Sequence, residues 1–313
     1  MSAPTAGEDR QVPPDLGSIF LDHVGHFVPD HEAAAKALRA LGFITTPWTV
    51  LTSPDPLGGP PVLTGTGNHC LMFHRGYVQI LAKTAETTLA RQFEQAMERY
   101  VGVHLVTFST RDAVYERARL ANSGFAVQPI VDLRRCYADP DGFEVDLAFS
   151  VARTVPGAMA EGRIQFIMHR TETANWRAEM MQHPNGAYSL TDQILTVSDL
   201  EPATTRWERF LGRRSSPVAC GRTFKLERGR VTLCRPEMAG VAVSGPVPPA
   251  PFLAAYGIGV SDLAPVLSTL EKAEIEPDDV APGRVSVRFP PALGVGMMHF
   301  LTREAEPPWL AAP

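Results

Sequence analysis

The sequence is poor in several features that would assign a protein class at once. It has only four cysteines in 313 residues, and none forms a CxxC pair, so we expect neither a disulfide framework nor a zinc–cysteine site. It contains no run of 18 apolar residues and no run of five basic residues, and its net charge is −5. These absences predict a protein with no membrane-spanning helix and no nucleic-acid or membrane partner.

Residues 1–14 also lack the apolar stretch of a secretory signal. They are polar and contain proline, so we expect a frayed N-terminal segment and a cytoplasmic location. The hydrophobic content of 44 % is enough for two cores in a chain of this length. The composition therefore predicts two domains of ordinary size.

What the sequence does contain is one unit that occurs four times. Residues 21–30, LDHVGHFVPD, are typical of a strand, and the helix that follows has Asp30 as its N-cap and Gly42 after its end. The same order of strand, aspartate and helix returns three times, with Asp112, Asp199 and Asp262 at the helix starts. Four copies at this spacing predict a fold built from internal repeats.

Each unit also ends in a similar way. A glycine precedes one residue of any type, an aliphatic residue or Met, a variable residue and an apolar residue: GYVQI from Gly76, GRIQF from Gly162, GRVTL from Gly229 and GMMHF from Gly296. The variable position holds Gln79, Gln165, Thr232 and His299. Each unit is therefore predicted to be a strand, a helix and then further strands.

The segments between these landmarks give weaker signals. Residues 48–67 are rich in Pro, Gly and Thr, which predicts a loop beside the binding pocket. Residues 68–73 and 77–82 indicate a hairpin, and residues 88–100 a linking helix. Two strands, 126–136 and 143–151, are expected on either side of the turn DPDG at 139–142.

Paired βαβββ units, with a histidine in the first strand and a polar residue in the last, resemble the vicinal oxygen chelate superfamily. The stretches GTGNHCLMFHRGYVQILA, GRIQFIMHRTE and WRAEMMQHPNGA are similar to its glyoxalase-like proteins. The resemblance covers about residues 18–302. It implies an α+β fold of four βαβββ modules in two domains: 18–175, with the active or ligand site, and 187–302, a degenerate copy.

The resemblance also implies a site. In this superfamily two modules form a cup, and His23, His104, Gln79 and Gln165 would meet at its centre as metal ligands, with the histidines as catalytic groups. A divalent zinc, nickel, manganese or iron ion held there keeps positions open for substrate oxygens. Relatives usually supply a glutamate, whereas both last-strand positions here are glutamine. A neutral amide leaves the dication uncompensated, which predicts weak binding.

Two alternatives remain open for this site. DPDGFEVDLAF could be the last strand of its module, which would place Glu144 or Asp146 at the metal position, although the match of GRIQF to GYVQI favours Gln165. The two histidines could also be core residues that donate to carbonyl groups. Their similar placement in the repeat favours a functional interpretation. Four histidines outside the pattern are interpreted as structural: His26, His31, His69 and His74.

Residues 176–187 are expected to link the two halves, with a turn at Asn185 and Gly186. The resemblance suggests that Trp176 and His183 bind ligand at the border of the site. The alternative for His183 is a hydrogen bond within its own turn. Met180 and Met181 are most simply packing residues.

The second half lacks a comparable set of side chains. Its corresponding positions are Asp192, Ala254, Thr232 and His299, which are not a metal triad. An iron site such as that of the ring-cleaving dioxygenases of the superfamily is therefore disfavoured. We expect this half to brace the first, to hold a lid, or to form an interface, which would allow a homodimer.

The sequence leaves two functions open. One is a glyoxalase-like lyase or isomerase, in which a metal or an amide-rich pocket polarises a carbonyl group of a small carbonyl- or oxygen-bearing metabolite while His23 or His104 moves a proton. The other is a metal-free protein of the same fold that binds and sequesters a small molecule.

Overall fold

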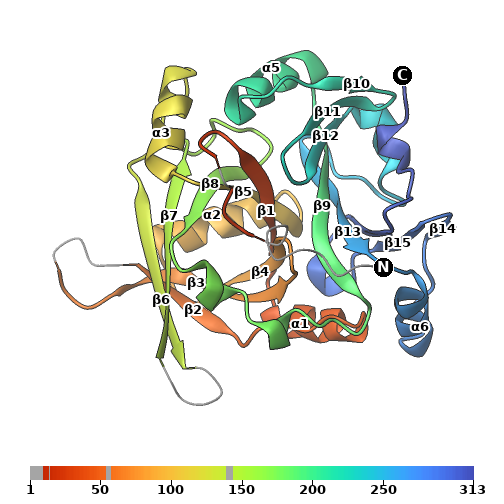
Figure 1. The fold of residues 1–313 in the computed structure, drawn as a ribbon, viewed down its shortest axis with the longest axis horizontal. Helices are drawn as coiled ribbons and strands as arrows, with labels where there is room; N and C mark the ends of the chain where they lie inside the picture. Colours follow the sequence, from red (N-terminus) through yellow and green to blue (C-terminus); the bar gives the residue numbers. More distant parts are fainter. Residues whose placement is uncertain (1–9, 14, 54–57, 139–143) are drawn as a thin grey trace.

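The computed structural model describes residues 10–13, 15–53, 58–138 and 144–313, and in them the strands join into one 16-stranded sheet (Figure 1). The first half, as we call β1 to β8, comprises β1 (Ile19–Phe27), α1 (His31–Ala40), β2 (Thr49–Ser53), β3 (Val62–Met72), β4 (Tyr77–Lys83), α2 (Thr88–Met97), β5 (Gly102–Thr110), α3 (Ala113–Asn122), β6 (Val131–Ala138), β7 (Glu144–Arg153) and β8 (Arg163–His169). The link has α4 (Glu172–Asn175) and the 3-10 turn η1 (Ala178–Met180).

The second half comprises β9 (Ala187–Thr196), α5 (Leu200–Leu211), β10 (Ser216–Val218), β11 (Gly221–Lys225), β12 (Arg230–Cys234), η2 (Pro236–Val241), β13 (Phe252–Val260), α6 (Ala264–Lys272), β14 (Asp279–Ala281), β15 (Arg284–Arg288), η3 (Pro291–Leu293) and β16 (Met297–Leu301), and η4 (Pro308–Leu310) follows. These elements form four βαβββ modules, two in each half. The predicted α+β fold is thereby confirmed. The domain limits at 175 and 187 stay a prediction.

Each module closes in the same way. Its first strand pairs in parallel with its last strand: β1 with β4, β5 with β8, β9 with β12 and β13 with β16. The side chains of Asp30, Asp112 and Asp199 accept hydrogen bonds from the first turn of the helix that follows, as the sequence predicts. The four modules therefore share the same strand pairing, so positions in different modules can be compared residue by residue.

The modules pair through their first strands. β1 runs antiparallel to β5 in the first half, and β9 runs antiparallel to β13 in the second. One residue pair, Val103 with Leu253, joins β5 to β13 and makes the sheet continuous. Figure 1 shows the two halves of this sheet as two curved parts side by side, the first half in red to green and the second in teal to blue.

Arginine side chains form hydrogen bonds between the two halves at the C-terminal ends of α3 and α5. Arg119 donates to the carbonyl oxygens of Arg209 and Phe210, and Arg209 donates to the carbonyl oxygen of Ser123. Each helix thus receives, at its negative end, a guanidinium from the other half, which satisfies carbonyl groups left free by the helix.

The prediction of a loop over residues 48–67 is wrong for the part of this segment that the structure describes. β2 and β3 pair as antiparallel strands, with a bulge between Val50 and Thr52. The prolines of this segment that the structure describes, Pro60 and Pro61, stand outside the strands, because both precede β3. β2 is also the edge strand at this end of the strand order, where proline and irregular pairing are tolerated. The expected hairpin of β3 and β4 and the expected helix α2 are confirmed.

The expected turn at 139–142 lies outside the described residues. β6 and β7 on either side of it pair as antiparallel strands, and β8 follows as the last strand of the module. Gln165 lies in β8, at the position that Gln79 holds in β4. The rival register, with β7 as the last strand, is therefore wrong.

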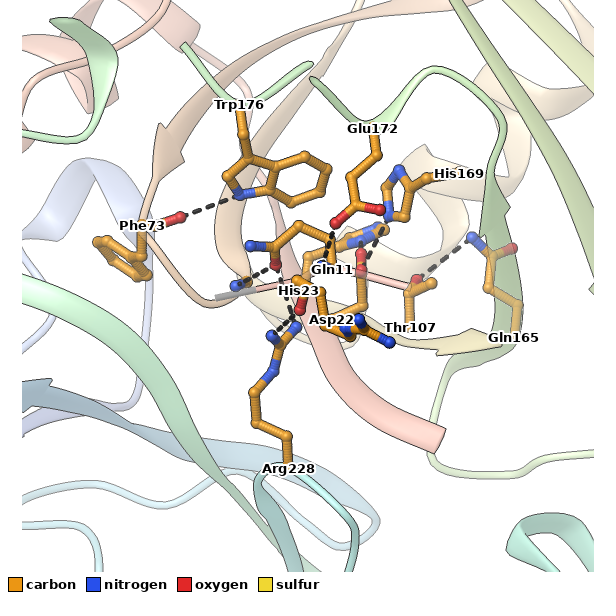
Figure 2. Close-up of polar contacts among 12 residues, drawn as sticks. Gln11, Asp22, His23, Phe73, Thr107, Gln165, His169, Glu172, Trp176 and Arg228 are labelled. Atoms are coloured by element: carbon orange, nitrogen blue, oxygen red, sulfur yellow. Dashed lines mark hydrogen bonds and ion pairs between the residues drawn. The ribbon is translucent and has the colours of Figure 1, made fainter. Parts of the chain in front are cut away.

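The N-terminal segment is not frayed at Gln11. Its side chain is 2 % exposed, donates to the carbonyl oxygen of His74 at 2.6 Å and accepts from the backbone N–H of Gly76 at 3.2 Å. Arg228 of the second half donates to the same side chain (Figure 2). A polar composition thus does not predict disorder where a long side chain finds buried backbone partners. In the part of the chain that the structure describes, no helix has the length and apolar character needed to cross a membrane.

Candidate active site in the first half

The concave face of the first half encloses a cavity of about 280 Å³. All eight strands of this half and α2 contribute to its lining. Most of the wall is apolar, and the larger polar side chains in it are His23, Tyr77, Gln79, Arg153, Arg163 and Gln165. An apolar wall with a few converging polar groups is the usual construction of a small-molecule site.

His23 is held in this wall by a buried carboxylate. Asp22 accepts from His23 Nδ1 at 2.5 Å with one oxygen and from His169 Nε2 at 2.8 Å with the other, so it lies between two imidazoles (Figure 2). Burial alone would raise the pKa of Asp22, but His169 and His23 more than offset it and hold that pKa well below its ordinary value. Because Nδ1 donates to Asp22, Nε2 of a neutral His23 carries the lone pair.

A β-bulge makes this contact between neighbouring residues available. Side chains of adjacent strand residues normally point to opposite faces, which would separate Asp22 from His23. The pairing of β1 with β5 shifts between Leu21 and His23, so Asp22 is the extra residue of a bulge. Bulges re-aim side chains, and this one brings the carboxylate to the imidazole. Tyr77 stacks on the His23 ring, with ring centroids 4.2 Å apart.

Two glutamines lie near His23 on the same wall, as the repeat predicts. Gln79 pairs with Gly25 across β4 and β1, and Gln165 pairs with Thr107 across β8 and β5. Gln165 Nε2 donates to Thr107 Oγ1 at 3.3 Å, while its Oε1 is buried without a partner among the described residues (Figure 2). A buried acceptor that the protein leaves unsatisfied is available to a ligand.

Two arginines complete the polar part of the wall. Arg163 stands two residues before Gln165 on β8, and Arg153 pairs with Gln165 from β7. Burial lowers the pKa of both, and Arg153 also contributes to lowering that of Arg163, to about 9. Both also line a second cavity, of about 350 Å³. The two cations therefore stand in an apolar environment, and Arg153 disfavours the charge of Arg163.

His104 does not join this group, which corrects the predicted convergence of four residues. It lines the second cavity, and its Nε2 bonds the carbonyl oxygen of Tyr100 at 2.7 Å. Burial lowers its pKa to about 4 despite that carbonyl. His23 precedes its helix cap by seven residues, whereas His104 precedes its cap by eight. A shift of one residue along a strand turns a side chain to the opposite face of the sheet. The register pairs Val24 with Val106, so Leu105, not His104, corresponds to His23.

The two linker residues expected at the ligand site serve the backbone of the first half. His183 accepts from the N–H of Ile44 and bonds the carbonyl oxygen of Met72, both at 2.9 Å, and it is absent from the cavity wall. Both partners lie outside its own turn, so the expected hydrogen bond of this side chain within the turn is wrong, while ligand binding by His183 stays a prediction. Trp176 donates to the carbonyl oxygen of Phe73 and packs against His169, behind the wall (Figure 2). Met180 and Met181 pack as expected.

The side chains of the cup do not fit a divalent metal ion. The described lining holds no aspartate or glutamate, and the donors expected to meet are reduced to one imidazole and two neutral amides. Two guanidinium groups share the wall, and a dication placed there would be repelled by both. The alternative carboxylate ligand Asp146 is exposed and pairs with Arg134, while the side chain of Glu144 lies outside the described residues. We therefore derive no chemistry through a metal.

The second half has the same concave face, but side chains fill it. Trp309 from η4 is fully buried there, and its Nε1 donates to Asp192 Oδ1 at 3.3 Å. Asp192 pairs with Arg230 as His23 pairs with Tyr77, so the indole bonds the counterpart of His23. His299, the counterpart of Gln165, packs against Trp309 and bonds Ser286 and the carbonyl oxygen of Ala242.

Sequence reasoning missed Asp22, His169 and the two arginines. Residues two apart in a strand face the same side. Arg163 therefore shares a face with Gln165 on β8, and Arg153 shares a face with Val151 on β7. The sequence therefore contained a signal for the arginines. It contained none for Asp22, because a bulge is not visible in the residue pattern.

Comparisons with known proteins agree with this architecture. A family model described as a glyoxalase-like domain matches residues 21–211. No curated protein sequence matches the chain significantly. A hypothetical protein from Staphylococcus aureus has a similar structure, with a TM-score of 0.63, 11 % identity, and coverage of 91 % of this chain and 99 % of that one.

Two further structures are similar. A triple mutant of 4-hydroxymandelate synthase from Streptomyces coelicolor matches with a TM-score of 0.56 and 13 % identity, over 92 % of this chain and 93 % of that one. A fusion of a xylose isomerase-like TIM barrel with a 4-hydroxyphenylpyruvate dioxygenase matches with a TM-score of 0.53 and 12 % identity, over 94 % of this chain and 50 % of that one. At these identities the likeness establishes the fold.

Proposed function

Because this chain belongs to the glyoxalase-like domain family of the vicinal oxygen chelate fold, we propose that its first-half cup is an active site for proton transfer on a small carbonyl-bearing metabolite. The reaction type is that of a lyase or an isomerase. The observation that carries the proposal is His23, a wall residue of the cup whose ring is fixed by the buried Asp22. A buried carboxylate that fixes the tautomer and orientation of a histidine is typical of a histidine that acts as a general base.

The proposed step uses His23 as the base and Gln79 as the group that polarises the substrate. His23 Nε2 takes a proton from the carbon next to the carbonyl group, the electron pair of that C–H bond forms a C=C bond to the carbonyl carbon, and the π pair of the carbonyl group moves to its oxygen to give an enolate. The amide N–H of Gln79 donates to this oxygen as its negative charge develops. In an isomerase the carbonyl group re-forms as the imidazolium returns the proton to the far carbon of a C=C bond conjugated with the enolate, which shifts that double bond. In a lyase the carbonyl group re-forms as the bond to a leaving group on the β carbon breaks, and the imidazolium protonates that group.

Asp22 supports this step without touching the substrate. Its carboxylate fixes the tautomer of His23 and stabilises the imidazolium that forms, as the carboxylate does in hydrolase triads. His169 bonds the other carboxylate oxygen and so limits how Asp22 can rotate. We therefore assign Asp22 and His169 as positioning residues and His23 as the catalytic residue.

The test is exchange of carbon-bound protons. A panel of small aldehydes, ketones and keto acids is incubated with the protein in D₂O, and protein-dependent loss of the proton signal beside the carbonyl group is followed by NMR. We expect at least one compound to exchange, and His23→Gln to lower its rate by about 10²-fold or more. Circular dichroism checks that the variant is folded.

His104→Gln is the matched control, because His104 lines the other cavity and bonds a backbone carbonyl. Its exchange rate should equal that of the wild type. A rate that falls equally in both variants would contradict the assignment of His23, and no exchange with any compound would contradict the proposed reaction.

Binding without turnover is the second candidate function, and the largely apolar wall favours it. In that case compounds bind in calorimetric titration, none exchanges its protons, and His23→Gln retains the affinity of the wild type.

A further inference from the structure

The second half shows how an inward arginine is satisfied when the protein supplies its own partner. Arg230 is the first residue of β12 and stands next to Asp192 of β9 in the parallel pairing. Its Nε and one terminal nitrogen each donate to a different oxygen of the Asp192 carboxylate, both at 2.8 Å. This two-pronged contact raises the pKa of Arg230 and is the strongest geometry for such a pair.

The first half has an arginine at the same position without that partner. Arg163 is the first residue of β8 and stands next to Leu105 of β5, so Leu105 occupies the place of Asp192. Among the described residues, no carboxylate or carbonyl group accepts from the guanidinium of Arg163 in a hydrogen bond. Instead of a raised pKa, Arg163 has one lowered to about 9 by burial and by Arg153. The same register position is thus neutralised in one half and left charged in the other.

Arg153 adds a second cation to the same wall. It pairs with Gln165, two residues along β8 from Arg163, so the three side chains neighbour one another on one face of two adjacent strands. Its Nε is buried and has no hydrogen-bond partner among the described residues. A buried donor of this kind is costly unless a ligand satisfies it, and the charge makes an anionic ligand the favourable one.

We propose that the ligand of the first-half cup carries a carboxylate, which lies between Arg153 and Arg163 and takes the role that Asp192 has in the second half. Its apolar body packs against the leucine, valine and phenylalanine side chains of the wall. This inference rests on the proposed function and narrows its substrate to small carbonyl compounds that are also carboxylates. A carboxylate is preferred over a phosphate because the protein's own partner at this register position is a carboxylate, in two-pronged contact.

The test compares three probes with the same body. 3-Phenylpropionate, its neutral amide and the neutral ketone 4-phenylbutan-2-one are titrated into the full-length protein by calorimetry. We expect 3-phenylpropionate to bind at least about tenfold more tightly than either neutral probe, because hydrogen bonds to charged groups contribute more than neutral ones. Inorganic phosphate, titrated in parallel, should bind more weakly than 3-phenylpropionate.

The variants Arg163→Gln and Arg153→Gln should each abolish the preference for the carboxylate over the amide. Arg163→Lys keeps the charge but loses the two-pronged geometry, so its preference should lie between those of the wild type and Arg163→Gln. Arg214→Gln is the matched control, because the Arg214 side chain is 93 % exposed and lies in the second half. It should bind all three probes as the wild type does.

His23→Gln separates this inference from the proposed function. It should retain carboxylate binding, because the arginines do not depend on His23, while proton exchange is lost. Equal affinity for the carboxylate and the neutral probes, or a preference that survives both arginine-to-glutamine variants, would overturn the carboxylate assignment and leave the role of His23 intact. Tighter binding of phosphate would overturn the carboxylate class. Failure of all probes to bind would count against the cup as a ligand site.

Discussion

In the first half the concave face of the sheet encloses a cavity, whereas in the second half the corresponding residues pack around Trp309. The two faces share one register, so the difference lies in the side chains placed on it. Each module has one residue at the register position of Asp192. In the first half that position holds His23 in the first module and Leu105, beside Arg163, in the second. Polar groups that the second half satisfies internally are therefore left for a ligand in the first.

The comparison also indicates why one duplicated fold can keep both arrangements. A filled cup contributes packing and stability, while an open cup with unsatisfied donors lowers stability and offers binding. Because the second half contributes this stability, the first half can keep a cup that is not fully packed. The second half, joined to the first through Arg119 and Arg209, supports it from outside.

The largest expected effect is loss of the indole that fills the second cup. Trp309 is fully buried, so Trp309→Ala should lower the free energy of unfolding by about 3–5 kcal/mol, because it leaves a cavity and removes the hydrogen bond to Asp192. Leu89→Ala, at the wall of the open cup, should cost less than about 1 kcal/mol, since that side chain already borders empty space. Urea unfolding of both variants measures this. Equal losses would show that the two cups do not differ in packing.

A smaller effect is expected from removal of the carboxylates at the two cups. Asp22→Asn should lower the proton-exchange rate by about 10²-fold, because the amide no longer fixes the His23 tautomer or stabilises the imidazolium. Asp192→Asn removes the partner of Arg230 in the filled cup and should leave the rate of folded protein unchanged. NMR exchange at equal concentrations of folded protein measures both. A matching fall in the Asp192 variant would mean that the second cup takes part in the reaction.

Acid should weaken the filled cup through His299. Burial lowers its pKa in the folded protein to about 4, against about 6.5 when unfolded. The unfolded chain therefore binds a proton in the window between these values, and stability falls as the pH drops from about 6.5 towards 4. Between pH 7 and pH 4.5 the free energy of unfolding of the wild type should therefore fall by about 2 kcal/mol more than that of His299→Gln.

Urea unfolding at both pH values measures this contribution. His299→Gln loses hydrogen bonds at every pH, so only the difference between the two pH values is informative. The same difference in the variant and the wild type would mean that His299 does not titrate in this window.

The smallest effect concerns metal binding in the open cup. With one imidazole, two neutral amides and two cations, the wild type should bind manganese or zinc weakly and exchangeably. Gln165→Glu supplies a carboxylate and should raise that affinity about tenfold, although Arg153 and Arg163 compete for the new charge. Calorimetric titration with each metal decides it. Tight one-to-one binding by the wild type would contradict our assessment of the donor set.

Much of the fold could be predicted from the sequence alone. The aspartates that start the helices and the glycines that start the last strands recur at matched positions, and these local signals place four modules without tertiary information. Gln79 and Gln165 are on the cup wall, as the repeat predicts, because a strand's alternation fixes the face once the strand is aligned. The sequence thus determined the modules and the two amides of the site.

Only the tertiary structure decided the rest of the site. The bulge at Asp22 turns a carboxylate towards His23 and leaves no trace in the pattern of residue types. The spacing of His104 to its helix cap is one residue longer than that of His23, but only the register showed that this puts His104 on the other face. Trp309 fills the second cup from far along the chain. Strand periodicity is a local property, but bulges, counterions and the segments that fill a cavity depend on which distant residues meet, and sequence spacing does not specify that.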